Sequence, residues 1–291
     1  MKHIKYFFEF VIIISLFSLF KIIGLNNASA LGAFLAKLIG PLFRSQKIIK
    51  SNIKTGLGTI NNEKESEIIS AMWSNIGRTF AEYVFLKKFK FNRAGFNHIK
   101  INGVKYLEEI KKNNETAVFY SAHFANFELM AMQLHKSGIK CAAIYRPLNN
   151  YFLNPLMEFL RIKYICPNQI PKGRMGVREI IGKVGDGYSI ALMVDQRVSE
   201  GPRVLFFNRP AHTTTIPAQL ALKYGCKLVP ISLERKEGTN FEMTVHEPYK
   251  VKKTGNDKED TKNITLKINH IIEKMILNNP KQWIWSHNRW K

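Results

Sequence analysis

The stretch that decides the fold is AVFYSAHFANFE, residues 117–128. Its first four residues are apolar, as in a buried strand, and a histidine, His123, and an acid, Glu128, follow at the start of a helical pattern. Five residues along an ideal helix turn the chain by about 140°, so these two side chains would not share a helical face. They meet only if His123 lies in the turn before the helix and Glu128 reaches back from its first turns.

That geometry is typical of a general base with its orienting carboxylate. The imidazole of His123 would take a proton from a hydroxyl group, and the carboxylate of Glu128 would fix the tautomer and stabilise the imidazolium. The alternative is a histidine that caps a helix in which a glutamate happens to occur.

Short apolar runs alternate with helical patterns along the rest of the chain. The predicted strands are Ala117–Tyr120, Cys141–Tyr145, Ile190–Val194 and Leu228–Leu233, and the predicted helices between them lie near Phe127–Lys136, Asn154–Lys163, Val177–Val184 and Pro217–Tyr224. This alternation predicts right-handed crossovers and an α/β fold with a mainly parallel sheet flanked by helices. Two helical patterns, Glu63–Ser74 and Trp73–Leu86, precede this region, and the charged segment Lys252–Lys262 is predicted to be a mobile loop.

Three of the predicted strands are followed by a side chain capable of chemistry. These residues are His123, Arg146 and Asp195. Ligands of open α/β sheets gather at the carboxyl ends of the strands. We therefore expect the three side chains to converge on one site, which favours the catalytic interpretation of His123.

The composition predicts a folded protein that attracts polyanions. Apolar residues make up 45% of the 291 residues, and 44 Lys and Arg against 22 Asp and Glu give a net charge of +22. Such a surplus attracts nucleic acid, an anionic membrane, or an acidic or phosphorylated partner, although an A/T-rich coding bias accounts for part of the lysine. The basic residues are diffuse and no nucleic-acid motif is present, so we expect no nucleic-acid partner.

No metal site is predicted. The three cysteines, Cys141, Cys166 and Cys226, have no CxxC spacing, and the histidines form no HExxH motif.

Residues 1–43 are predicted to anchor the chain to a membrane. Phe10–Phe20 is nearly uninterrupted apolar sequence, and Ile4–Leu25 would be about 33 Å long as a helix. A second apolar segment, Leu31–Phe43, is typical of a helix at the membrane interface. Basic residues follow at once and would meet anionic headgroups: Arg44, Lys47, Lys50 and Lys54. The heavier positive flank places the rest of the chain on the cytoplasmic side.

The alternative is a secretory signal peptide, with Lys2 and Lys5 at its start and the small residues 28–30 at its exit. Glu9 and Lys21 interrupt that pattern, so we favour an uncleaved anchor that either spans the membrane or lies embedded in it.

Taken together, these motifs resemble the late acyltransferases of lipid A biosynthesis, the lauroyl and myristoyl transferases. The resemblance rests on His123-x4-Glu128, Tyr145-Arg146-Pro147, Arg161, Asp195-Gln196 and the closing segment Trp283–Lys291, in order and at plausible spacings. Ser286 and Asn288 depart from the apolar residue and second arginine that the closing segment would carry. The family is distantly related to the glycerophosphate acyltransferases, which implies a glycerophosphate-acyltransferase-like fold for a catalytic domain over residues 44–291.

The resemblance implies transfer of a fatty acyl chain of about C12–C14 from acyl carrier protein to a hydroxyl of a lipid A precursor. The reaction would take place at the cytoplasmic face of the inner membrane, whose anionic lipids, like the acidic carrier and the phosphorylated acceptor, would attract a basic protein. No cofactor is expected beyond the acyl carrier protein as co-substrate. No GxSxG motif is present, so we expect direct transfer without a covalent acyl-enzyme.

The resemblance also implies roles for individual residues. His123 would be the base and Glu128 its orienting acid, while Arg161 would stabilise the oxyanion or hold a phosphate, unless it is a solvated helix residue. Asp195 would orient an arginine or the acceptor sugar, or cap a turn.

Four further residues are predicted to bind substrate. Arg146 would bind acceptor phosphate or anchor its turn, and Gln196 adjoins Asp195. Arg178 lies in a basic stretch after Pro171 that would bind phosphate or form a surface loop. Arg203 lies in a loop that would adjoin the acyl-chain path or pack ordinarily.

Two other functions remain open from the sequence. The same His–acid pair would serve acylation of another lysolipid or glycolipid. A non-enzymatic, basic, membrane-associated binding protein would share the charge and the anchor.

Overall fold

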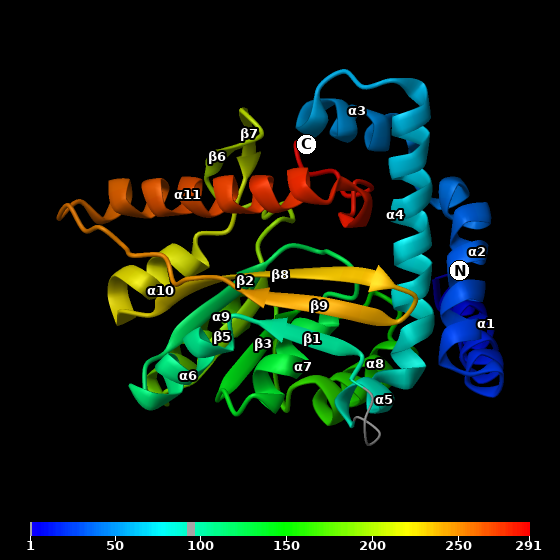
Figure 1. Cartoon of the computed structure of the whole chain (residues 1–291), viewed down its shortest axis with the longest axis horizontal. Helices are drawn as coiled ribbons and strands as arrows, with labels where there is room; N and C mark the ends of the chain where they lie inside the picture. The colour runs from blue at the N-terminus through cyan, green and yellow to red at the C-terminus, as the bar shows by residue number, and fades with distance from the viewer. Residues whose placement is uncertain (1, 92–96) are drawn as a thin grey trace.

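A central sheet of seven strands organises the computed structural model, which describes residues 2–91 and 97–291 (Figure 1). Met1 of the predicted anchor and residues 92–96 of the predicted catalytic domain lie outside the described residues. In order across the sheet, the strands are β1 (Ile99–Asn102), β9 (Asn240–Val245), β8 (Lys227–Glu237), β2 (Ala117–Ser121), β5 (Ser189–Met193), β3 (Cys141–Tyr145) and β4 (Asn168–Pro171). From β8 to β4 every pair is parallel, whereas β9 runs antiparallel to β8 and parallel to β1. The predicted mainly parallel α/β fold is therefore confirmed.

Helices cover both faces of the sheet, with α10 and α11 on one side and α6 and α7 on the other (Figure 1). The helices after the N-terminal pair are α3 (Gln46–Leu57), α4 (Asn62–Glu82), α5 (Leu86–Lys90), α6 (Val104–Lys112), α7 (Glu128–Lys136), α8 (Asn154–Leu160), α9 (Arg174–Gly185), α10 (Ile216–Tyr224) and α11 (Asp257–Asn278). Shorter helical turns are η1 (Tyr83–Phe85), η2 (Arg161–Ile165) and η3 (Pro280–Gln282), and β6 (Arg203–Phe206) pairs with β7 (Arg209–His212) in a hairpin.

The helical patterns 63–74 and 73–86 are confirmed as helical, and most of both forms the single helix α4. One sequence prediction needs correction. The predicted mobile loop 252–262 is wrong in its second half, where α11 begins. The Asn256 side chain caps α11 by accepting a hydrogen bond from the Glu259 N–H, and the acidic residues of the first turn stabilise that end of the helix.

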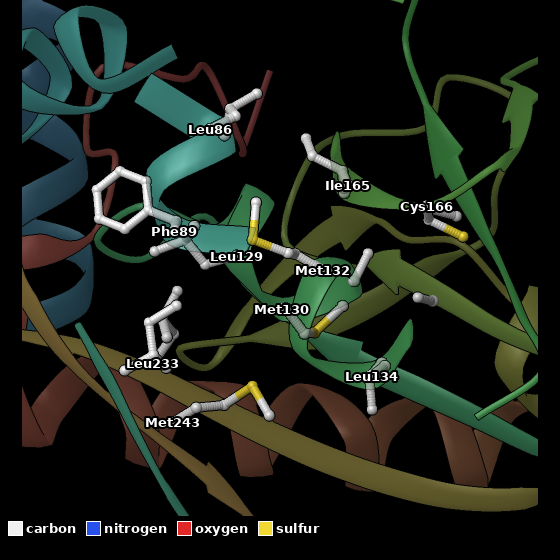
Figure 2. Close-up of a cluster of buried hydrophobic side chains, with 14 of the residues drawn as sticks. Leu86, Phe89, Leu129, Met130, Met132, Leu134, Ile165, Cys166, Leu233 and Met243 are labelled. Carbon is white, nitrogen blue, oxygen red and sulfur yellow. The ribbon is translucent and has the colours of Figure 1, made fainter. Parts of the chain in front are cut away.

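Strand β2 explains why residues 117–121 are continuously buried. Successive side chains point to opposite faces, so Phe119 packs in one hydrophobic cluster and Val118 and Tyr120 pack in another. Figure 2 shows part of the first cluster, to which α7 contributes Leu129, Met130, Met132 and Leu134. A strand covered on both faces has no polar side to show in the sequence.

The N-terminal pair of helices lies along α4 (Figure 1). Helix α1 (Lys2–Ile23) is long and apolar enough to cross a membrane, and only 11% of its most apolar stretch is buried. Helix α2 (Leu25–Phe43) contains the segment that the sequence predicted at the interface. It crosses α4 where Gly32 faces Gly77, so closely that a Cβ atom on Gly32 would lie 2.4 Å from the Gly77 carbonyl oxygen.

Candidate active site

The ends of strands β2 and β5 bring His123 beside Asp195. The two strands are parallel neighbours in a register that pairs Ser121 with Met193, and each residue of interest lies two positions further on. Arg146 follows β3, the next strand across. His123 and Arg146 line one cavity of about 590 Å³, while Asp195 lies buried behind His123.

His123 and Asp195 form a close pair. His123 Nδ1 lies 2.7 Å from Asp195 Oδ1, and the His123 backbone N–H donates to Oδ2 over 3.1 Å. The Trp283 indole N–H donates to the same Oδ2 over 2.8 Å. Burial alone would raise the pKa of Asp195, but the His123 imidazole and these N–H donors outweigh it and lower the pKa to about 2. The carboxylate is therefore ionised at neutral pH.

An ionised carboxylate accepts hydrogen bonds and cannot donate them, so Nδ1 of His123 carries the hydrogen. The lone pair of the neutral imidazole then lies on Nε2. Gln196 Nε2 lies 3.3 Å from that atom, and the Phe127 ring packs edge-on with its centroid 4.7 Å from the imidazole centroid. In this tautomer Nε2 is the nitrogen of His123 able to accept a proton, and His123 lines the cavity.

Glu128 does not take the predicted position beside His123, and the sequence interpretation is corrected here. Its carboxylate accepts hydrogen bonds from Arg161 Nε over 3.1 Å and from Arg161 Nη2 over 2.7 Å, and it also accepts the Tyr83 hydroxyl. The carboxylate beside His123 is that of Asp195. The physical reason is the strand order. Strand β5 lies next to β2, so the acid that follows β5, Asp195, lies beside the turn that carries His123.

Arg161 is held with one nitrogen free. It opens the π-helical turn η2, a departure from α-helix geometry that is frequent at functional sites. Its Nη2 also donates to the Tyr83 hydroxyl over 2.8 Å, whereas its buried Nη1 has no hydrogen-bond partner within the described chain. Arg161 lines the cavity with His123, although Nη1 itself is buried.

The mouth of the cavity is basic. Arg44, Arg146 and Lys172 line it, and none of them forms an ion pair with any residue in 2–91 or 97–291. Burial and then the charge of Arg146 lower the pKa of Lys172. Cations that repel one another and form no ion pair favour an anionic ligand.

Two of the predicted substrate-binding residues lie elsewhere. Arg178 is exposed on α9, and Arg203 is exposed on β6, where its Nε donates to His212 over 3.4 Å. Neither lines the cavity. Gln196 and Arg146 do line it.

The sequence interpretation missed Tyr83, Trp283 and His287. His287 lines the cavity, and its Nε2 accepts the Arg197 backbone N–H over 3.0 Å, while burial lowers its pKa from 6.5 to about 4. Trp283 and His287 belong to the closing segment, which the sequence interpretation noticed only as a block. Nothing in single-residue patterns indicated that a tryptophan would touch the Asp195 carboxylate.

The remaining wall of the cavity is largely apolar. Its apolar side chains come from α7, the ends of β3 and β5, and the segments around them: Phe127, Met130, Ala131, Leu148, Ile165, Leu192, Met193 and Ile216. Within the described residues, no group of three or more His, Cys, Asp or Glu side chains could hold a metal ion.

Comparison with known proteins gives a consistent result. A model of the bacterial lipid A biosynthesis acyltransferase family matches residues 1–291. The chain is 23% identical to the lipid A biosynthesis lauroyltransferase of Escherichia coli, over 90% of this chain and 84% of that protein. It is 28% identical to a lipid A biosynthesis acyltransferase of Haemophilus influenzae over 66% of this chain and 60% of that protein. The lipid A biosynthesis palmitoleoyltransferase of E. coli is 23% identical over 86% of this chain and 80% of its own length.

Proposed function

The chain belongs to the bacterial lipid A biosynthesis acyltransferase family, and from that premise we propose that it moves a fatty acyl chain from acyl carrier protein to a hydroxyl of a lipid A precursor, with His123 as general base. Membership makes the chain an acyltransferase and sets aside the alternative of a non-enzymatic binding protein. The donor, a chain length of about C12–C14 and the mechanism are parts of the proposal.

The chemical step is a direct transfer. Nε2 of His123 takes the proton of the acceptor hydroxyl as its oxygen attacks the thioester carbonyl carbon, which gives a tetrahedral oxyanion. Collapse of this intermediate breaks the carbon–sulfur bond and leaves the ester. The departing thiolate takes its proton from the His123 imidazolium, so the base is regenerated.

Asp195 and Arg161 have the two other roles in this step. Asp195 holds the tautomer that leaves Nε2 unprotonated, and its charge stabilises the imidazolium that forms during the reaction. The unpartnered Nη1 of Arg161 is the donor we assign to the oxyanion. Glu128 and Tyr83 orient that guanidinium, which is the role we give Glu128 in place of the one predicted from sequence.

Substrate binding is supported by the two halves of the cavity. The unpaired cations Arg44, Arg146 and Lys172 suit the phosphates of the acceptor, and Gln196 is placed to contact the reacting groups. The apolar wall suits the acyl chain. The net charge of +22 favours an acidic carrier protein and an anionic membrane surface. We place the protein at the inner membrane, anchored by α1, with the cavity on the cytoplasmic face.

The single observation that carries the proposal is that His123, paired with Asp195, lines the same cavity as Arg161, whose Nη1 has no hydrogen-bond partner among the described residues. The test is turnover of the purified full chain with lauroyl- and myristoyl-carrier protein, with product masses measured for a lipid A precursor and for a lysophospholipid acceptor. A product that adds one acyl mass to the lipid A precursor is expected. An added mass on the lysophospholipid alone would replace the proposed acceptor.

Variants then test the roles. General-base assistance is worth roughly 10²–10⁴-fold, so folded His123→Ala should keep less than a tenth of the wild-type turnover. Asp195→Asn and Arg161→Lys should each lose at least about tenfold. Arg146→Ala removes an arginine that lines the cavity. Its matched controls are Arg178→Ala and Arg203→Ala, which remove arginines outside the cavity and should keep a turnover within about twofold of the wild type. A His123→Ala protein above a tenth of wild-type turnover would contradict the mechanism.

A further inference from the structure

The loop between His123 and Glu128 is held in an unusual backbone conformation. Ala125 has a φ of 46°, in the left-handed region that costs a residue with a Cβ atom free energy. Its carbonyl oxygen accepts hydrogen bonds from Asn75 Nδ2 over 3.0 Å and from Thr79 Oγ1 over 2.9 Å, both on α4. Helix α4 therefore fixes the loop from behind the cavity.

A buried carboxylate on the same helix holds the next residue. Glu82 is fully buried, and its Oε2 accepts the Asn126 Nδ2 hydrogen over 2.9 Å. The Asn126 side chain is 1% exposed, and its Oδ1 has no hydrogen-bond partner within the described chain. The bond to Glu82 is thus the interaction that orients this amide.

Arg235 of β8 ties these contacts into one network. Its two terminal nitrogens pair with the two carboxylate oxygens of Glu82, which offsets the cost of burying that charge. Its Nε donates to Asn75 Oδ1 over 3.1 Å, and this leaves the Asn75 amide nitrogen to bind Ala125. One guanidinium therefore orients Asn75 and Glu82, two of the three side chains that hold the loop.

The network also reaches the N-terminal helices. Ser29 of α2 donates its hydroxyl hydrogen to Glu82 Oε1 over 2.9 Å, and Arg78 Nη1 donates to the Ser29 oxygen over 3.1 Å. Helix α2 thus contacts the carboxylate that binds Asn126.

We propose that Glu82 is a positioning residue, which through Asn126 holds loop 124–127 and thereby sets His123 in place relative to Arg161 and Glu128. Glu82 does not line the cavity, so it acts without touching substrate. The inference rests on the proposed function for its kinetic consequence, but the geometry it concerns exists without substrate. A displacement of about 1 Å at a reacting group costs up to about 10²-fold in rate, so loosening this loop should lower kcat.

The experiment reverses the polarity of one hydrogen bond. Glu82→Gln replaces one of the two acceptor oxygens with an NH₂ group, so the donors Asn126 Nδ2, Ser29 Oγ and Arg235 compete for the single oxygen left. Asn126→Asp sets two carboxylates against each other. The double variant Glu82→Gln/Asn126→Asp restores a bond from Gln to Asp and keeps one negative charge near Arg235. Asn126→Ala removes the bond while leaving the Glu82–Arg235 ion pair, so it tests the loop in a chain that keeps its buried charge paired.

Two readouts are measured on the full-length protein in detergent. Hydrogen exchange of the peptide covering residues 122–128 needs no substrate, and it should speed up in Glu82→Gln, Asn126→Asp and Asn126→Ala and return toward wild type in the double variant. With substrates, kcat should fall about tenfold or more in these single variants with KM for the acceptor within twofold, and recover to within about threefold in the double variant.

A purely structural role predicts a different outcome. Exchange would then rise over the whole chain in step with the thermal midpoint, and the double variant would be no better than Asn126→Ala in exchange or kcat; either result overturns the proposal. If the wild type does not acylate the lipid A precursor, the proposed function fails, and hydrogen exchange still decides whether Glu82 holds the loop.

Discussion

At the scale of single residues, the charge of Asp195 decides what His123 can do. A neutral acid would donate a hydrogen bond and allow either tautomer, whereas the ionised carboxylate, with its pKa lowered to about 2, requires a donor at Nδ1. In the proposed mechanism the proton acceptor is therefore Nε2 of His123. Asp195 keeps this charge through the donors on its two oxygens, of which Trp283 provides one.

His287 is predicted to make the fold less stable as the pH falls. Burial lowers its pKa from 6.5 to about 4, so the folded chain keeps the imidazole neutral where the unfolded chain binds a proton. Between pH 6.5 and about pH 4 the unfolded state binds more protons, and the free energy of unfolding therefore decreases as the pH is lowered through this window. Thermal unfolding of the full chain at a series of pH values measures the effect.

The variant His287→Gln retains an acceptor for the Arg197 N–H but does not titrate. Its thermal midpoint should change less between pH 7 and pH 5 than that of the wild type. His270→Gln, at an exposed position on α11, serves as the control and should follow the wild type. An unchanged pH dependence in His287→Gln would contradict the assignment.

At the scale of elements, the closing segment acts on the site through Trp283. Trp283→Phe removes one of the donors to the Asp195 carboxylate and keeps an aromatic ring in the core. Hydrogen bonds to charged groups contribute about 1.5–3 kcal/mol, so stability should fall by about that amount. Because His123 depends on the same carboxylate, kcat should also fall about tenfold, measured by product mass at saturating substrate.

The matched control is Trp290→Phe, which removes an indole bond of 3.0 Å to the Phe206 carbonyl oxygen. It should lose stability but keep kcat within about twofold of the wild type. Equal losses of kcat in the two variants would mean that Trp283 contributes only packing.

The crossing of α2 and α4 gives a second prediction at this scale. A Cβ atom at Gly32 would lie 2.4 Å from the Gly77 carbonyl oxygen and 2.8 Å from the Ala81 Cβ atom, so Gly32→Ala must push the helices apart. Overpacking of this kind costs about 1–3 kcal/mol, and thermal unfolding should detect it. The bond from Ser29 to Glu82 crosses the same interface and should weaken with it.

Gly182→Ala on α9 is the control, because no heavy atom lies within 4 Å of the added methyl group. Alanine is favoured over glycine in a helix by about 0.5–1 kcal/mol, so this variant should be as stable as the wild type or more so. A Gly32→Ala protein as stable as Gly182→Ala would show that the crossing is looser than the structure has it.

The sequence predicted the individual strands and helices better than it predicted which of them lie side by side. The strands β2, β3, β5 and β8 and the turn that carries His123 are legible in apolar runs, because local patterns determine them. The sequence did not show that Asp195 is the partner of His123. That contact depends on β5 lying next to β2, and two residues that are 72 positions apart leave no local signal of their contact. Glu128 was the nearest acid in sequence, but α7 carries it toward Arg161.

At the scale of the whole molecule, the mouth of the cavity lies next to the C-terminal end of α2, the second of the two N-terminal helices. Arg44 follows α2 directly and lines the cavity, while the residues just before it, Leu42 and Phe43, are 82% and 75% exposed. Exposed apolar side chains beside an unpaired cation are typical of a segment at a lipid headgroup boundary. An acceptor with acyl chains in the bilayer and phosphates at its surface would reach such a mouth without leaving the membrane.

Helix α1 is therefore predicted to control membrane binding through its outer face. Ile4, Phe8 and Ile12 recur every fourth residue and are 65%, 62% and 59% exposed, so they form a stripe that the protein itself leaves uncovered. Burying a large apolar side chain contributes about 1.5–3 kcal/mol, so Phe8→Glu/Ile12→Glu should lower partitioning into anionic phospholipid vesicles by about 10²-fold or more.

Flotation at low and high salt separates the electrostatic from the apolar contribution to membrane binding, because salt screens the +22 charge and leaves the apolar contribution. Wild-type protein should still float at high salt, and so should Leu205→Glu, which places the same charge at an exposed apolar position on β6. If the α1 variant floats at high salt as the wild type does, another surface holds the protein to the membrane.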